Sequence, residues 1–237
     1  MKKALYIGIM TLLCHGQSSA QFLIGPQAGA NFATLTGTSL SVNAKPGWHI
    51  GAFMSIPFSK HVSIMPALLY VVDGYKYDYT TTTTTTAQPS TDTTITTLTT
   101  LNANVDATLG HLDLPVLLNY FAGETKGLMI QAGLQLSFLI VDNSTVSTTT
   151  TTTVSINGGN PTTTPPTEPS NQNNISLTKA NVSIVGGVGY KFSQLLILYT
   201  RVVTGLAKQQ EGGFVKDADS GHIFSFEGGI ALSFGAK

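Results

Sequence analysis

The chain has 237 residues and a formal net charge of zero, and only 10% of its residues are charged. Globular proteins carry about 25% charged residues, so the deficit indicates a large surface that does not face water. No apolar run reaches the 18 residues of a transmembrane helix, which excludes a helical membrane protein, and no basic patch predicts nucleic-acid binding.

Residues 1–20 have the three parts of a secretory signal peptide. A pair of lysines precedes an apolar stretch, and small residues ending at Ala20 offer a cleavage site. We expect cleavage there, which leaves residues 21–237 as one mature domain with a net charge of about −2, because the signal removes two of the 12 basic residues. The single cysteine, Cys14, also leaves with the signal, so we expect no disulfide, thiolate ligand or cysteine nucleophile.

Eight segments of the mature chain alternate apolar and non-apolar residues, and this period of two predicts β-strands. In the last segment, Phe224 and Phe226 fall on one face while Ser225 and Glu227 fall on the other. An apolar outer face and a polar inner face predict an eight-stranded antiparallel up-and-down barrel in a membrane, since a closed barrel pairs every backbone group. The predicted strands are Ile24–Ala33, Gly47–Phe58, Val62–Tyr77, Leu109–Phe121, Leu128–Val141, Asn181–Phe192, Leu195–Thr204 and His222–Phe234.

The connections between these strands alternate between short and long. Outer-membrane barrels have short periplasmic turns and long external loops, so we expect both termini in the periplasm. Outward aromatic residues at both strand ends predict two interfacial girdles. Short turns are expected at 59–61, 122–127 and 193–194, and long connections near 34–46, 78–108, 142–180 and 205–221.

The connections at about 78–108 and 142–180 are low-complexity segments rich in threonine. Threonine favours extended structure, so a prolongation of the barrel strands and a solvated loop are both open. Asn, Gly and Pro favour a flexible second connection. Asp92-Thr93-Thr94 matches an O-glycosylation acceptor pattern, which marks Thr93 as a candidate modification site.

Strand parity places a set of polar and aromatic side chains inside the barrel. The interior of an eight-stranded barrel is just wide enough for side chains to fill, so an open pore is not expected. We expect a structural ion-pair network in which Arg201 and Glu227 lie on neighbouring strands and Asp113 meets Lys191 across the lumen. A proton or small-ion path is the alternative. The inward set is His49, Asp73, Tyr75, His111, Asp113, Gln131, Gln135, Lys191, Tyr199, Arg201 and Glu227.

No constellation predicts a catalytic, cofactor or metal site. His49 and His111 stand on separate strands without further ligands, so we expect lumen histidines without a metal. His222 and Ser225 are three residues apart and therefore point to opposite faces of a strand, which argues against a lipid-deacylating pair. The glycines of 186–189 lie inside a strand, where they leave room for bulky lumen neighbours or permit bending rather than bind phosphate.

Five motifs carry a resemblance to a known family. The chain resembles the PorT-like outer-membrane β-barrel family of Bacteroidetes-type Gram-negative bacteria along almost all of its mature length. The resemblance implies an eight-stranded barrel, in most members without an assigned activity and in some linked to secretion or gliding. Met65 and Ala67 stand where that family has Gln and Glu, so the polar lumen is altered here. The motifs are Ile24–Phe32, Pro46–Gly51, Pro66–Tyr70, Leu112–Leu118 and Arg201–Leu206.

These observations favour a non-enzymatic protein of the outer membrane with a packed lumen. Its expected contacts are outer-membrane lipids, the barrel insertion machinery and a protein partner reached through loops or turns, with no nucleic acid. The insertion signal departs from the usual pattern because three residues follow Phe234. Two alternatives are a narrow channel for small solutes or ions and a lipid A-modifying enzyme.

Overall fold

The computed structural model describes residues 22–37, 42–123, 126–167, 170–173, 179–193, 195–208 and 221–235, so the expected signal peptide lies outside the described residues. Within these ranges no helix is long and apolar enough to cross a membrane. The strands are β1 (Leu23–Thr36), β2 (Val42–Pro57), β3 (Val62–Ser90), β4 (Thr93–Phe121), β5 (Gly127–Asp142), β6 (Thr145–Ile156), β7 (Thr162–Thr163), β8 (Ser170–Asn173), β9 (Ala180–Lys191), β10 (Leu196–Lys208), β11 (His222–Leu232) and β12 (Phe234–Gly235).

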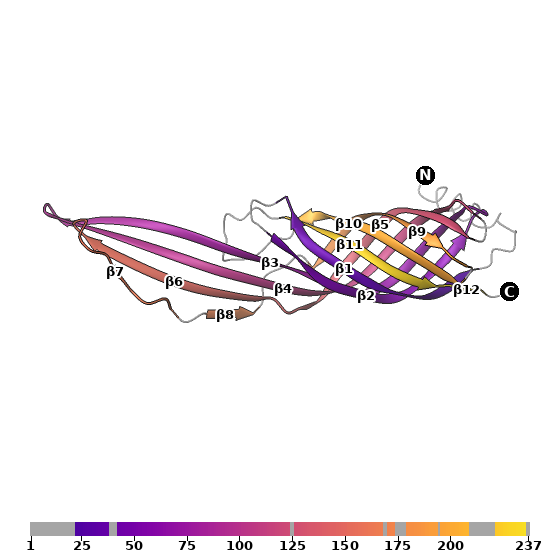
Figure 1. The fold of residues 1–237 in the computed structure, drawn as a ribbon, viewed down its shortest axis with the longest axis horizontal. Coiled ribbons are helices and arrows are strands. Elements are labelled where there is room, and N and C mark those ends of the chain that lie inside the picture. Colours follow the sequence, from indigo (N-terminus) through magenta and orange to yellow (C-terminus); the bar gives the residue numbers. More distant parts are fainter. Residues whose placement is uncertain are drawn as a thin grey trace, which may run out of the picture.

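Eight of these strands close into a ring of antiparallel neighbours (Figure 1). The order is β3-β2-β1-β11-β10-β9-β5-β4, and β3 pairs with β4 to complete the ring. β12 continues the pairing of β11 with β1. The predicted eight-stranded antiparallel barrel is therefore confirmed, and the predicted segments match these strands closely where short turns join them.

The two ends of the barrel differ. At one end, which we call the turn end, short turns at 58–61, 122–126 and 192–195 join the strands, as predicted. The opposite end carries the longer connections, but the predicted long connection at 34–46 is wrong. β1 runs to Thr36 and β2 begins at Val42, because threonine and valine here continue the extended backbone. The turn begins at Gly37, whose φ of 78° suits glycine.

A narrow sheet extends from the barrel opposite the turn end (Figure 1). β3 and β4 are 29 residues long each and stay paired from Val62↔Tyr120 to the tight turn at Thr91-Asp92. β6 pairs along β4, and β7 and β8 pair with β6. We call this sheet, residues 78–106, 145–167 and 170–173, the blade. The solvated-loop alternative is thus wrong for most of 78–108, and the prolongation of barrel strands is confirmed.

The second threonine-rich connection is also extended over much of its length. β6 ends at a turn in which Asn157 has a φ of 50°. The Asn157 side chain ties this turn to the blade tip: its Oδ1 accepts from Thr94 N (2.6 Å), and its Nδ2 donates to Asp92 O (3.1 Å). The expectation of a flexible segment is therefore wrong for residues 145–156.

Burial alternates along the barrel strands. Leu117 is fully buried while Leu118 is 54% exposed, and Gln131 is buried while Ile130 is 50% exposed. The exposed apolar side chains form the outer face, where lipid solvates them in an outer-membrane barrel. Aromatic side chains are exposed near both ends of this face, as the girdle prediction requires. They include Phe58, Tyr120, Phe192 and Phe234 at the turn end and Phe32, Trp48 and Phe138 toward the blade.

Candidate functional site

Arg201 on β10 is the centre of a buried polar layer inside the barrel. Its side chain is 1% exposed. Its Nε donates to Gln131 Oε1 (3.3 Å), and its Nη2 donates to Gln27 Oε1 (3.0 Å). Gln131 Nε2 donates in turn to Asn119 Oδ1 (3.0 Å). Side chains from β1, β4, β5 and β10 therefore meet inside the ring.

An aromatic pair extends this layer toward β2. The guanidinium carbon of Arg201 lies 3.9 Å from the centroid of the Tyr199 ring, a distance at which a cation–π contact is favourable. The Tyr199 hydroxyl lies 2.7 Å from His49 Nε2, with the donor set by the histidine tautomer. His49 thus faces the lumen, on the side that strand parity predicts, and shares a hydrogen bond with a tyrosine.

A group of acidic side chains lines the lumen between this layer and the blade. Asp73, Asp113 and Glu227 surround a cavity of about 30 Å³ together with His111. His111 Nδ1 lies 3.3 Å from Asp73 Oδ1, and Gln135 Nε2 donates to Asp113 Oδ2 (2.6 Å). A volume of this size admits roughly one water molecule. In the described part of the chain, no set of His, Cys, Asp and Glu residues is arranged to hold a metal ion.

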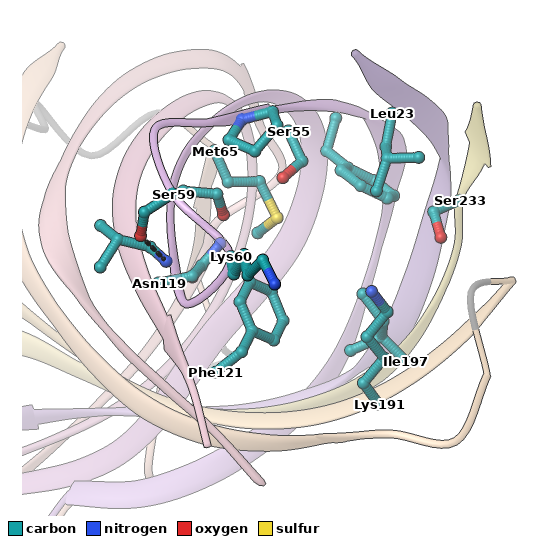
Figure 2. A pocket seen from close by; sticks show the side chains of 14 residues that line it. Leu23, Ser55, Ser59, Lys60, Met65, Asn119, Phe121, Lys191, Ile197 and Ser233 are labelled. Carbon is teal, nitrogen blue, oxygen red and sulfur yellow. Dashed lines mark hydrogen bonds between the residues drawn. The ribbon is translucent and has the colours of Figure 1, made fainter. Parts of the chain in front are cut away.

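A larger cavity of about 290 Å³ opens at the turn end, which we call the turn-end cavity. Asn119 and Phe121 on β4, Met65 on β3 and Lys191 on β9 contribute to its lining (Figure 2). Lys60 reaches the lining from the β2–β3 turn, which is ordered because the backbone N–H groups of His61 and Val62 donate to Ser59 Oγ. This cavity and the cavity of about 30 Å³ have different lining residues.

An ionic cluster joins the blade to the barrel rim. Lys45 on β2 and Lys76 on β3 contact the two carboxylate oxygens of Asp106 at 2.5 and 2.7 Å. Partial burial alone would raise the pKa of Asp106, but hydrogen bonds from both lysines and their positive charges lower it below its usual value. Lys45 also donates to Thr108 Oγ1. The cluster therefore fixes the base of the blade with charge-assisted bonds.

Neither of the two predicted ion pairs is present in the described residues. Arg201 and Glu227 are direct register partners on neighbouring strands, as expected, but Arg201 hydrogen-bonds glutamines instead, and no ion pair joins the two side chains in the described residues. Asp113 and Lys191 do not meet, so that pairing is wrong. Asp113 is level with Asn181 through Ser137, and Lys191 lies roughly 30 Å further along β9 at about 3.3 Å per residue.

Three fully buried amide side chains were absent from the predicted inward set. Gln27, Asn31 and Asn119 are at most 1% exposed, although polar amides are seldom fully buried. Their signal was present in the sequence, because each has the parity of the inward face of its strand. Gln27 and Asn119 hold members of the polar layer, so they belong to the same site.

Two glycines make room for the bulky side chains of the polar layer, which bears out the prediction for 186–189 at Gly187 but not at Gly186, where a Cβ atom would meet nothing within 4 Å. A Cβ atom on Gly187 would lie 3.0 Å from Arg201 Cγ and 2.4 Å from the Thr200 carbonyl oxygen. A Cβ on Gly229 would lie 2.6 Å from the Tyr199 hydroxyl. The close approach of these side chains to neighbouring strands therefore requires residues without a side chain.

The remaining candidate residues lie apart. His222 Nδ1 contacts the Gly205 carbonyl oxygen at 3.1 Å, while Ser225 is buried on the inward face of β11. The prediction that these two residues point to opposite faces agrees with this placement. Thr93 begins β4 next to the blade tip and is partly buried. Its glycosylation stays a prediction.

The sequence of the chain matches one protein family over residues 16–209, and the family is described as "Outer membrane protein beta-barrel domain". The chain belongs to this family. Its barrel is therefore an outer-membrane barrel, and the exposed apolar face is the surface that meets lipid. The family description covers outer-membrane barrels in general and does not distinguish a PorT-like subfamily. No curated protein sequence matches the chain.

Several solved outer-membrane barrels are similar to this chain. Ail, the attachment invasion locus protein of Yersinia pestis, is 8% identical with a TM-score of 0.40, covering 92% of this chain and 100% of Ail. Neisserial surface protein A is 10% identical with a TM-score of 0.35, covering 90% and 97%. OprG from Pseudomonas aeruginosa is 8% identical with a TM-score of 0.30, covering 93% and 99%. Likenesses at this level carry no functional information.

Proposed function

We propose that this protein is a non-enzymatic outer-membrane anchor that holds a rigid partner-binding blade outside the cell. The observation that carries the proposal is the unbroken run of β3 and β4 from the barrel wall to the blade tip. Residues 78–90 alone reach about 40 Å at roughly 3.3 Å per residue. Long connections of outer-membrane barrels face outward, which supports an external blade and periplasmic termini.

A closed lumen supports anchoring rather than transport. Arg201, Leu117, Leu69 and Gln131 are each at most 1% exposed and fill the interior from four strands. An eight-stranded barrel has little room beyond such side chains. The barrel is then a support, and the surface that meets a partner is the blade.

The edge of β3 in the blade is the part best suited to bind a partner. β2 stops pairing with β3 at Val42↔Tyr77, so among the described residues no strand lies beside the outer edge of 78–90. Most side chains of this edge are exposed, residues 79–90 carry no charge, and the pairing of this segment with β4 keeps one register as far as Ala87, with a shift between Ala87 and Ser90 near the tip. Charged residues and bulges usually block free edges, and an open edge accepts an extended segment by strand addition.

Two adjacent proline substitutions test this role. Successive residues of a strand point their N–H groups in opposite directions, so one of Thr82→Pro and Thr83→Pro removes an outward N–H and the other breaks a bond to β4. We expect both variants to lose a partner that cross-links to the intact protein, while Thr149→Ala on β6, away from this edge, keeps it. Unchanged cross-linking by both proline variants would refute strand addition.

The topology can be tested separately because the mature chain has no cysteine. We expect Asp92→Cys at the blade tip to react with a membrane-impermeant maleimide on intact cells. Ser193→Cys in the turn between β9 and β10 should react only after the outer membrane is permeabilised. The opposite labelling pattern would place the blade in the periplasm and overturn the proposal.

The resemblance to the PorT-like family suggests that the partner belongs to a secretion or gliding apparatus. Deletion of the chromosomal copy should then lower the amount of secreted protein or the gliding speed. A variant in which Asn-Gly replaces residues 81–101 should fail to restore the phenotype, although its barrel inserts. Full restoration of secretion or gliding by that variant would show that the blade is not needed for the process.

A further inference from the structure

The turn-end cavity has polar groups with no assigned partner. Asn119 is completely buried, and its Oδ1 accepts from Gln131, but its Nδ2 has no hydrogen-bond partner among the described residues. Ser63 is 3% exposed, and its Oγ is unpaired in the same way. Both side chains line the cavity. A buried donor without a partner destabilises a fold by about 1–3 kcal/mol, so a ligand that accepts these bonds would stabilise the protein.

The charges of the cavity have one sign. Lys191 lies on the wall and Lys60 lies on the turn at the mouth, as Figure 2 shows, and the described lining contains no acidic side chain. Lys191 Nζ lies 5.4 Å from the centroid of the Phe121 ring, and no carboxylate contacts it in the described residues. The ammonium group of Lys191 and the buried amide and hydroxyl donors together select an anion that accepts hydrogen bonds.

The rest of the lining is apolar. Phe53, Met65, Phe121 and Ile197 lie beside the donors. A volume of about 290 Å³ is at the lower limit of the range for small-molecule pockets, about 300–1,000 Å³. The ligand must therefore be small and have one charged end and one apolar end.

We infer that the turn-end cavity binds a small amphiphilic carboxylate. The carboxylate accepts from Asn119 Nδ2 and Ser63 Oγ beside Lys191, and the apolar part packs against Met65 and Phe121. Such a carboxylate is the head of a short fatty acid or the C-terminus of a peptide with an apolar last residue. This role is independent of the blade, because the cavity lies at the opposite end of the barrel.

Binding can be measured through the NMR signals of methionine methyl groups. The mature chain has three methionines, Met54, Met65 and Met129. Met65 lines the cavity, Met54 is exposed on the outer face and Met129 is buried in the lumen. With ¹³C-methyl methionine and the full mature protein in lipid nanodiscs, hexanoate should shift the Met65 signal along a saturable curve. Met54 reports any partition of the ligand into lipid.

Matched ligands and variants decide the result. Hexanamide and hexylamine have the same tail without the carboxylate and should shift Met65 at least tenfold more weakly. Lys191→Met should weaken hexanoate binding at least tenfold, while Lys76→Met, which makes the same charge change at the blade base, should leave it unchanged. Asn119→Asp, nearly isosteric with asparagine, should also weaken binding, because it places a negative charge in the cavity.

The source of the ligand follows from two further probes. Tighter saturable binding of N-acetylleucine than of hexanoate identifies a peptide C-terminus, and the reverse identifies a fatty acid. The absence of a saturable Met65 shift with hexanoate would overturn the inference. Equal shifts with hexanoate and hexanamide, or an unchanged affinity in Lys191→Met, would overturn it. A folded Lys191→Met barrel, shown by its Met54 and Met129 signals, excludes misfolding as the cause of lost binding.

Discussion

Arg201 and Tyr199 share the inward face of β10, and the guanidinium of Arg201 stacks on the Tyr199 ring at 3.9 Å. The ring lies between the buried charge and His49, whose Nε2 is 2.7 Å from the tyrosine hydroxyl. A buried guanidinium is tolerated only when its N–H groups find acceptors. Here two glutamines accept from Nε and Nη2 and the Tyr199 ring lies against the guanidinium, in place of the carboxylate that the sequence suggested, while Nη1 has no hydrogen-bond partner among the described residues.

Removing Arg201 should strongly destabilise the barrel. Arg201→Leu leaves Gln27 and Gln131 without a donor and Glu227 without a neighbouring positive charge, which should lower the free energy of unfolding by about 3–5 kcal/mol. Urea unfolding in detergent, followed by the loss of the compact band in electrophoresis, measures this change. Arg201→Lys should lower the free energy of unfolding by a smaller but measurable amount, since an ammonium group cannot reproduce the two glutamine contacts.

A stable Arg201→Leu barrel with an altered conductance would contradict this structural role. That outcome would favour the ion-path alternative instead, in which the arginine controls passage rather than packing.

Small side chains added at Gly187 should also be destabilising. Gly187→Ala places a carbon atom against Arg201 Cγ and the Thr200 carbonyl oxygen, and overpacking of this kind costs about 1–3 kcal/mol. Gly186→Ala is the matched control, because a Cβ there meets nothing within 4 Å. Parallel urea unfolding of the two variants measures the difference. Equal midpoints would show that the arginine moves aside without strain.

The intact protein should show no steady conductance in planar bilayers. We expect the polar layer around Arg201 to close the lumen, and that layer lies within the barrel. Replacement of residues 81–101 by Asn-Gly should therefore also give a protein without steady conductance, since the blade does not close the lumen. Steady single-channel currents in the intact protein would revive the narrow-channel alternative.

The base of the blade should loosen in acid. The folded-state pKa of Asp106 lies below its ordinary value of 3.8, so the stabilisation is complete above that value and is lost as the pH falls through the folded pKa. Hydrogen exchange at Thr145, the register partner of Asp106, should accelerate relative to β9 amides below about pH 4. Asp106→Asn should exchange rapidly at every pH. An acid response that persists in Asp106→Asn would assign it to another group.

The attachment of the β6 turn to the blade tip, through the two hydrogen bonds of the Asn157 side chain, should depend on both the side chain and the backbone conformation of Asn157. Asn157→Ala removes two hydrogen bonds and forces alanine into a left-handed conformation, whereas Asn157→Gly removes the bonds but suits the φ of 50°. We expect the tip to open more in the alanine variant, by about 1 kcal/mol. Hydrogen exchange at Thr94 measures the opening. Equal rates in both variants would show that the backbone contributes nothing.

The alternation of apolar residues predicts the barrel strands because lipid and lumen impose opposite demands on successive residues. Leu117 and Leu118 show the limit of this signal, since both are leucine and only their neighbours reveal which one is buried. In Thr80–Thr86 every residue is the same, so no alternation exists. Composition there could not separate a strand from a loop, and pairing with β4 decided the outcome.

Strand parity also predicts which side chains enter the lumen, but it does not predict their position along the barrel axis. Asp113 and Lys191 both point inward, yet they lie far apart along the barrel. Their relative height depends on the stagger of the strands on closure, which a single sequence does not encode in any local pattern. Gln27 and Asn119 were predictable, since each alternates with outward neighbours. Their hydrogen bonds to the polar layer were not, because these depend on the rotamers of residues from other strands.

The continuity of β3 and β4 has a mechanical consequence. A sideways load on the blade tip acts through a lever about 40 Å long, at roughly 3.3 Å per residue. The torque falls on the rim near Tyr77 and Val105, where β2 stops supporting β3. The salt bridges from Lys45 and Lys76 to Asp106 lie beside this part of the rim. Shear from flowing water or from a pulling partner would therefore reach the bilayer as a tilt of the whole barrel.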